Sequence, residues 1–250
     1  GILQTAERSS HYDPSENVVF QRHLVAYKEA AKLINGGVVL EIGSGEGYGI
    51  NELAPQSDSY IAIDKYPTNI SEDLKIKHDI TFIHSEVPPL VDITSNSIDF
   101  VVSFQVIEHI QDDNKFLAEI YRVLKDSGFV VIHCPDIQQV AVEVAKGNFV
   151  TPLYYSDPNT PISAADIMYG HISSIAAGNT FMAHKSGFTS SLLNGELKKA
   201  GFNRVSIIKA SQAYALHALA HKNTIISQEE SDKLLLEHLP YKEINEVLYK

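Results

Sequence analysis

The fold of this chain is decided by the stretch Val38-Val39-Leu40-Glu41-Ile42-Gly43-Ser44-Gly45-Glu46-Gly47. Its first five residues are an apolar, mostly β-branched run, which is typical of a buried strand. The glycines that follow allow a tight turn and a close approach of the backbone to a ligand. Helical sequence continues to about Leu53, so this stretch predicts the first strand–turn–helix unit of an α/β sheet.

Short apolar strands alternate with helical segments through most of the chain. We expect further strands at 60–64, 80–84, 98–104 and 129–132, helices at 14–34, 112–124 and 189–200, and a last pair of strands at 204–208 and 214–220. Strands that alternate with helices indicate a parallel sheet covered on both faces.

These elements predict three parts in the chain. We expect an N-terminal helical cap over residues 1–35, a ligand-binding domain over 36–220, and a C-terminal helical tail over 221–250. The domain contains a loosely patterned insert at about 137–185, and long excursions of this kind are usually lids or binding loops. Its aromatic and methionine side chains are candidate walls of a substrate pocket: Tyr154, Tyr155, Met168 and Tyr169.

Composition narrows the function classes. The 250 residues include 20 basic and 31 acidic side chains, a net charge of −11, which argues against a nucleic-acid partner. Apolar runs are far shorter than the ~20 residues of a membrane span, so no membrane partner is expected. The single cysteine, Cys134, and the absence of a signal-peptide pattern at the start predict a cytoplasmic location. The oligomeric state stays open, with a homodimer as one alternative.

The spacing of the glycines indicates which ligand the turn binds. A nicotinamide fingerprint, Gly-x-Gly-x-x-Gly, would place its third glycine at Tyr48. Instead the glycines follow Gly-x-Gly-x-Gly, two residues after Glu41, and Asp64 ends the next strand, where its carboxylate could accept both hydroxyls of a ribose. A ligand with a ribose but no pyrophosphate has less need of a helix dipole. These features favour S-adenosylmethionine.

Four segments resemble the class I S-adenosylmethionine-dependent methyltransferases, of the type 11 and related subgroups. They are Val39–Gly47, Ala62–Asp64, Ser97–His109 and Leu124–Gly128, within about residues 36–136, in the family's order and spacing. The resemblance implies an α/β, Rossmann-like fold with a seven-stranded, mostly parallel sheet and helices on both faces. It also implies a methyltransferase enzyme with S-adenosyl-L-methionine as cofactor.

The resemblance assigns individual residues to the cofactor. They are Glu41, Gly43, Ser44, Gly45, Gly47, Asp64, Lys65, Glu86, Val87, Phe104, Gln105 and Val106. The glycines would line the methionine and ribose parts, and Glu41 would sit near the methionine amino group, directly or through water. Asp64 would hold the ribose. Glu86 stands where the family has an aspartate that meets the adenine amino group.

Three residues are candidates for catalysis: Glu108, His109 and His184. Methyl transfer is an in-line displacement that needs a general base only when the acceptor is protonated, and a histidine titrates near working pH. The competing interpretation is structural, with Glu108 as a helix cap and His109 packed on the sheet. In the small-RNA 3′-end 2′-O-methyltransferases, a Glu-x-x-Glu-His motif and a later histidine bind a divalent metal. Gln105 replaces the first acid here, so we expect no metal.

The sequence thus predicts an S-adenosylmethionine-dependent methyltransferase that acts on a small-molecule acceptor, with oxygen as the expected acceptor atom. Three alternatives remain at this point. The first is a catalytically silent domain that only binds the cofactor, and the second is a nicotinamide oxidoreductase, which Tyr48 disfavours. The third is a metal-assisted RNA 2′-O-methyltransferase, which the net charge and Gln105 disfavour.

Overall fold

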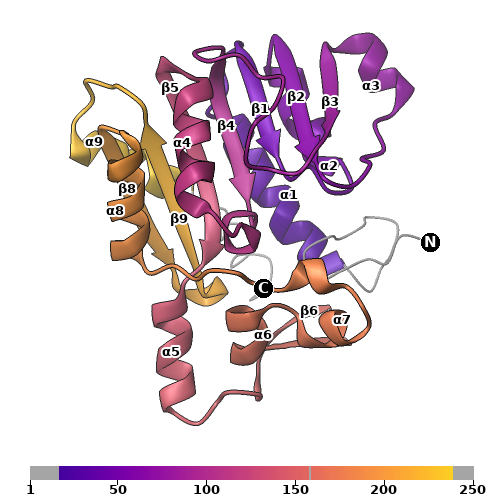
Figure 1. The fold of residues 1–250 in the computed structure, drawn as a ribbon, viewed down its shortest axis with the longest axis vertical. Helices are drawn as coiled ribbons and strands as arrows, with labels where there is room; N and C mark the ends of the chain where they lie inside the picture. The colour runs from indigo at the N-terminus through magenta and orange to yellow at the C-terminus, as the bar shows by residue number, and fades with distance from the viewer. Residues whose placement is uncertain (1–16, 158, 239–250) are drawn as a thin grey trace.

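The computed structural model describes residues 17–157 and 159–238, and a seven-stranded sheet forms its centre (Figure 1). The strand order is β3-β2-β1-β4-β5-β9-β8. The strands are β1 Val38–Ile42, β2 Ser59–Asp64, β3 Ile80–His84, β4 Ile98–Phe104, β5 Leu124–Pro135, β8 Arg204–Ala210 and β9 Ala215–His221. Pairs among β1 to β5 are parallel, whereas β9 runs antiparallel to β5 and β8. The mostly parallel sheet and the final hairpin are confirmed.

β5 is longer than the expected strand at 129–132. Ile98 pairs with Leu124, and the next pair, Phe100 with Phe129, follows a shift in register. The extra residues of β5 between these two pairs are a bulge, which the apolar pattern alone does not reveal because the bulge contains polar residues and Gly128.

Helices cover both faces of the sheet. They are α1 Asn17–Ala31, α2 Tyr48–Leu53, α3 Glu72–Lys77, α4 Asp113–Val123, α5 Ile137–Ala145, α6 Ala164–Tyr169, α7 Ile172–Ala176, α8 Ser190–Ala200 and α9 Gln228–Glu237. Side-chain caps start two of the expected helices, since Asp112 accepts from the amide of Lys115 and Thr189 from that of Leu192. Gly201, at φ 116°, ends α8 in the left-handed region.

The alternation of side chains along the strands divides the core into two layers. On one face, strand residues such as Leu40 and Val101 pack with apolar side chains of α4 and α8. On the other, Val39 and Val102 pack with those of α1, α2 and α9. Successive strand residues thus point to opposite faces, and both faces are buried, as expected of a parallel sheet.

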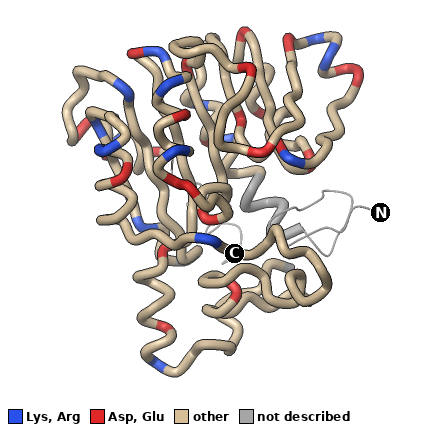
Figure 2. Tube along the Cα trace, viewed as in Figure 1, with Lys and Arg blue, Asp and Glu red and all other residues tan. Residues whose placement is uncertain are grey.

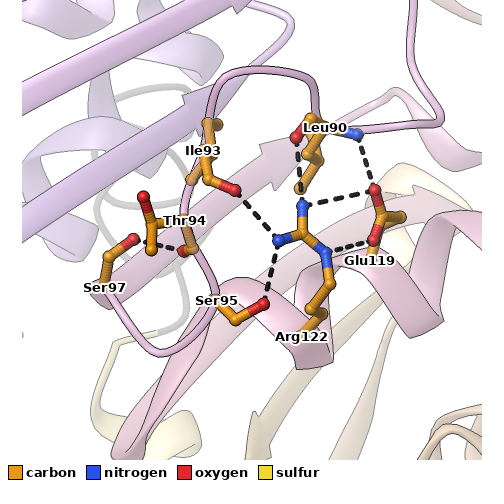
Figure 3. Close-up of polar contacts among 7 residues, drawn as sticks. All are labelled: Leu90, Ile93, Thr94, Ser95, Ser97, Glu119 and Arg122. Atoms are coloured by element: carbon orange, nitrogen blue, oxygen red, sulfur yellow. Dashed lines mark hydrogen bonds and ion pairs between the residues drawn. The ribbon is translucent and has the colours of Figure 1, made fainter.

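A single arginine fastens the loop between β3 and β4 to helix α4 (Figure 3). The Arg122 guanidinium donates to the carbonyls of Leu90 and Ile93, to the Ser95 hydroxyl and to the Glu119 carboxylate. The same carboxylate accepts from the amide of Leu90 at 3.0 Å. Arg122 lowers the pKa of Glu119, chiefly through their hydrogen bond. The middle of this loop is therefore held against α4.

The insert between β5 and α8 forms a small unit of its own beside the carboxyl ends of the parallel strands (Figure 1). It holds α5, α6, α7, the 3-10 turn η4 Thr180–Met182, and an antiparallel pair, β6 Pro152–Asp157 with β7 Thr160–Ser163. Its two ends meet, because Asp136 and Phe188 form a β-bridge and the amide of Ile137 donates to the Phe188 carbonyl.

Charge is distributed unevenly over the fold (Figure 2). Basic and acidic residues are interspersed over the sheet and its helices, whereas the insert is nearly free of both. Between residues 137 and 184 the charged residues are Glu143, Lys146, Asp157 and Asp166.

The expected terminal parts are described only in part. Helix α1 belongs to the expected N-terminal cap and α9 to the expected C-terminal tail, but residues 1–16 and 239–250 lie outside the described residues. Among the helices that are described, none has the length and apolar character needed to cross a membrane.

Candidate functional site

A cavity of about 420 Å³ opens at the carboxyl ends of β1 to β4, the edge where open α/β sheets bind ligands. The loops after these four strands form most of its wall, α1 contributes Tyr27, and the end of the insert closes one side. Predicted residues in the wall are Gly43, Ser44, Gly45, Asp64, Lys65, Glu86, Val87, Phe104, Gln105, Val106 and His109. Residues from four separate segments of sequence thus meet at one place.

The glycine turn after β1 provides space on one side of the cavity. Gly43 and Gly45 have φ angles of 79° and 55°, which a residue with a Cβ rarely adopts. A Cβ on Gly43 would lie 2.6 Å from Cγ2 of Val106, so any larger residue would fill the gap between the two loops. Glycine at position 43 is therefore required by both conformation and space.

Asp64 is fixed at the tip of β2 by two backbone amides. Its Oδ2 accepts from the amide of Gly45 and its Oδ1 from the amide of Tyr66, each at 2.8 Å. A carboxylate oxygen has two lone pairs, so each oxygen can still accept a bond from a ligand. The carboxylate is presented to the cavity in one orientation, as clasping a ribose would require.

Two predicted residues, Glu41 and Gly47, do not line the cavity, and their contact with a ligand stays a prediction. Glu41 is 1% exposed and lies behind the turn, where Oε1 accepts from the Tyr60 hydroxyl at 2.6 Å. Burial raises its pKa to about 7, although hydrogen bonds from Tyr27 and Tyr60 act in the opposite direction. Gly47 packs against the segment at Thr68 instead.

Gln105 occupies a strained position in the wall. Its φ is 58°, in the left-handed region, and its amide donates to the His133 carbonyl at 2.8 Å. Non-glycine residues held in this region often lie at functional sites. The strand therefore turns sharply after Phe104, so that Phe104, Gln105 and Val106 all line the cavity.

The three catalytic candidates lie together, but only His109 lines the cavity. Its Nδ1 is 3.3 Å from the Ala183 carbonyl and its Nε2 is 3.8 Å from Glu108 Oε1. The His184 ring packs edge-on against that of His109, with Nδ1 2.8 Å from the Ile167 carbonyl. Glu108 and His184 contact His109 but do not line the cavity, and the catalytic role of all three residues stays a prediction.

The interpretation of Glu108 as a helix cap is wrong, because Asp112 caps the helix that follows. Glu108 is 1% exposed within the 3-10 turn η3, Ile107–His109, and α4 is capped by Asp112. Its carbonyl oxygen accepts from the amides of Lys185 and Ser186. The backbone at Glu108 therefore holds the end of the insert against the site.

The insert and α1 bring residues to the cavity that no sequence motif predicts. These are Phe181, Met182, Lys185 and Tyr27. The nearest available signal was the run from Phe181 to Lys185, which precedes α8. The expected aromatic wall is wrong, since none of Tyr154, Tyr155, Met168 and Tyr169 lines the cavity.

Comparison with known proteins identifies the fold and the domain. Residues 40–132 match the family described as the methyltransferase domain. A probable S-adenosylmethionine-dependent methyltransferase of Mycobacterium tuberculosis is 34% identical over 135 residues, 54% of this chain and 49% of the relative. Phosphoethanolamine N-methyltransferase 1 of Triticum aestivum is 31% identical over 130 residues, 49% of this chain and 26% of the relative. The match thus spans about half the length of the mycobacterial relative and about a quarter of the length of the Triticum aestivum relative.

Solved structures agree on the fold. The 1,6-didemethyltoxoflavin-N1-methyltransferase of Burkholderia thailandensis, which contains S-adenosylhomocysteine, aligns with a TM-score of 0.53 at 17% identity, over 85% of this chain and 91% of that one. A methyltransferase of Aquifex aeolicus aligns with a TM-score of 0.51 at 17% identity, over 83% of this chain and 93% of that one. The sheet order agrees with the fold of these solved methyltransferases, and residues 40–132, which include the glycine turn, match the methyltransferase domain.

Proposed function

We propose that the chain is a methyltransferase whose cavity binds S-adenosylmethionine and a small-molecule acceptor. One observation carries this proposal. The glycine turn after β1 and the carboxylate after β2 are joined by the bond from Gly45 to Asp64 and face one cavity. The residues fit the cofactor. Gly43 and Val106 both line the cavity, and because Gly43 has no Cβ, the space between these two residues stays open. The domain match and the relatives' names support the same activity.

The wall residues suit the separate parts of the cofactor. We assign the ribose hydroxyls to Asp64, the adenine to the backbone at Lys65 and to Glu86 and Val87, and the methionine part to the glycine turn and residues 104–106. Glu41 takes the role of a support behind the turn, in contact with Tyr60. Backbone groups close to a ligand position it without the entropy cost of ordering long side chains.

His109 and the insert are assigned to the acceptor. When bound, S-adenosylmethionine supplies a methyl carbon on a sulfonium, and the sulfur keeps the electron pair as the acceptor bonds to that carbon. A hydroxyl acceptor must also lose its proton, and His109 is a histidine in the wall that could accept it. We therefore propose an oxygen acceptor, with residues 181–185 closing the cavity against water.

The small-molecule class of acceptor has support from the comparisons. The Burkholderia structure is named for 1,6-didemethyltoxoflavin, and the wheat relative for phosphoethanolamine. The net charge of −11 disfavours an RNA acceptor.

The cluster behind the wall favours one variant of this function, in which a metal ion assists. Glu108, His109 and His184 offer ligand atoms that all lie within 4.8 Å of one another. The carbonyls of Ala183 and Ile167 lie at the Nδ1 atoms of the two histidines, as carbonyls often do in metal sites. Two imidazoles and one carboxylate suit Zn²⁺ better than Mg²⁺. Calorimetry with ZnCl₂ on chelator-treated protein, compared with His184→Ala, tests this variant.

The main proposal is tested by calorimetry with S-adenosylhomocysteine and by a methyl-transfer assay with labelled S-adenosylmethionine over a panel of small acceptors. Binding at micromolar concentrations and label transfer are the expected results. Tight binding without transfer across the panel would favour a catalytically silent domain. No binding by well-folded protein would overturn the proposal.

A further inference from the structure

The cavity has two ends with different charge. Its four acidic wall residues all belong to the segments that follow β1 to β4: Glu46, Asp64, Glu86 and Asp112. The end of the insert contributes two apolar side chains, Phe181 and Met182, and one cation, Lys185, but no acid. If the adenosyl group occupies the strand loops, an acceptor meets the insert end of the cavity.

A second lysine reaches the same end. Lys65 begins beside the ribose-clasping Asp64, yet its Nζ lies 5.2 Å from the centre of the Phe181 ring and 5.4 Å from that of Tyr66. The Phe181 and Tyr66 rings are 5.0 Å apart, edge to face. Ring faces attract a cation without neutralising it, so the ammonium keeps its full charge where the insert meets the loop after β2.

The two cavity lysines have no acidic partner in the part of the chain that the structure describes. Within the described residues, neither Lys65 nor Lys185 forms an ion pair or a hydrogen bond through its ammonium. Four lysines elsewhere do form ion pairs, in Lys32–Glu29, Lys75–Glu72, Lys125–Asp99 and Lys146–Glu143. Exposed lysines such as Lys77 are also unpaired among the described residues, but they lie in solvent and not in a cavity wall. In a chain with 31 acids for 20 bases, two unpaired lysines in one cavity wall indicate a place for an anion from outside the chain.

The electrostatic environment of Lys65 agrees with this geometry. Burial lowers its pKa, and the charge of Lys185 lowers it further, whereas Glu86 and Asp64 raise it. The two ammonium groups are therefore close enough to repel each other. An anion between them would remove this repulsion and favour the charged form of both.

We propose that the acceptor carries a carboxylate or phosphate group, which Lys65 and Lys185 bind at the insert end of the cavity while its apolar part packs on Phe181 and Met182. This inference rests on the proposed function, since it names the class of acceptor for the same site. The cofactor sulfonium adds a third positive charge. An anionic acceptor is thus attracted to the loaded site, and a cationic acceptor is repelled.

The test uses the full chain saturated with S-adenosylhomocysteine and four probes that share a phenyl ring. Benzoate and phenyl phosphate carry the anion, benzamide is the neutral analogue, and benzylamine is the cation. Calorimetry should show both anions, or one of them, binding at least about 10-fold more tightly than benzamide, with benzylamine weakest. The stronger of the two anions identifies carboxylate or phosphate as the group recognised.

Variants assign the effect to the cavity. Lys185→Gln should lower the affinity for the anionic probe by about 10-fold and leave the affinity for benzamide unchanged. Lys185→Arg should retain most of the affinity for the anionic probe. Lys77→Gln removes an equal charge on the exposed α3 and serves as the matched control. Lys65→Gln should act like Lys185→Gln on the anion.

The outcomes separate the two proposals. If S-adenosylhomocysteine fails to bind, the proposed function fails with the acceptor site. If it binds, but anions and benzamide bind equally or Lys77→Gln weakens the anion as much as Lys185→Gln, the acceptor inference is overturned and the cofactor site stands.

Discussion

Gly45 donates its backbone amide to Oδ2 of Asp64 at 2.8 Å, which ties the turn after β1 to the tip of β2. Gly45 lies in the turn after β1 and Asp64 ends the adjacent parallel strand β2, and both residues line the cavity. The consequence is that neither element of the cofactor site is independent: a change in the carboxylate alters the turn, and a change in the turn alters the carboxylate.

Asp64→Ala should weaken binding of S-adenosylhomocysteine by about 1–3 kcal/mol, because charge-assisted bonds to the ribose and to the Gly45 amide are both lost. Calorimetry on the purified variant measures the change. Asp58→Ala removes a carboxylate that bonds the amide of Gly37 away from the cavity, and is the control. Equal affinity of Asp64→Ala and the parent chain would contradict the ribose assignment.

Gly45→Val should abolish cofactor binding while the fold persists. The φ of 55° at this position is unfavourable for a β-branched residue, and its side chain would enter the turn that faces the ligand. Circular dichroism confirms folding, and equilibrium dialysis with labelled S-adenosylmethionine measures binding. Retained binding would show that the turn does not face the cofactor.

Glu41→Gln should change how stability depends on pH. Burial raises the pKa of Glu41 to about 7, above the value of 4.5 for an exposed carboxyl, so the folded state holds a proton that the unfolded chain has released. The stability contributed by this group is complete below about pH 4.5 and is lost as pH rises through 7. Urea unfolding near pH 5 and pH 8 should show that the free energy of unfolding falls less between these two pH values in Glu41→Gln than in the parent chain. An identical loss in both proteins would exclude Glu41 as its source.

His217 predicts an acid sensitivity of the opposite sign. Burial lowers its pKa to about 3, below the ordinary 6.5, so the unfolded chain binds a proton that the folded chain does not. Stability should therefore fall as pH drops below about 6.5. His217 stacks on His133, with ring centres 3.7 Å apart, and His217→Phe keeps an aromatic ring there. The variant should lose less stability between about pH 6 and pH 4.5, measured by urea unfolding.

Arg122→Ala should destabilise the chain by about 2 kcal/mol, since it removes the bonds that hold the loop at Leu90 and Ile93. Lysine cannot reproduce the planar fork of the guanidinium, so Arg122→Lys should recover only a small part of the stability lost in Arg122→Ala. Urea unfolding gives the change in free energy. Full stability in Arg122→Lys would indicate that charge alone is required.

The sequence predicted those elements correctly whose pattern lies within a short stretch of the chain. The glycine turn, the strand at 98–104 and the acid at Asp64 follow from residues near one another, and the matching elements are found at the expected places.

The residues that could not be foreseen depend on contacts between distant segments. Phe181 and Lys185 reach the cavity only because the insert folds back on Glu108, and no periodic pattern encodes that path. The resemblance predicted His184 at the site, and in the fold His184 contacts the His109 ring but does not line the cavity. Residue type identified chemistry that could occur, whereas side-chain position depended on tertiary packing.

The two ends of the insert meet at Asp136 and Phe188. The chain leaves the sheet there, builds a unit that closes one side of the cavity, and returns to the same spot. This excursion can therefore be exchanged for another without a change in the order of the strands or in the loop residues around Asp64. Relatives that share the cofactor half and differ between these two points should differ in what they methylate.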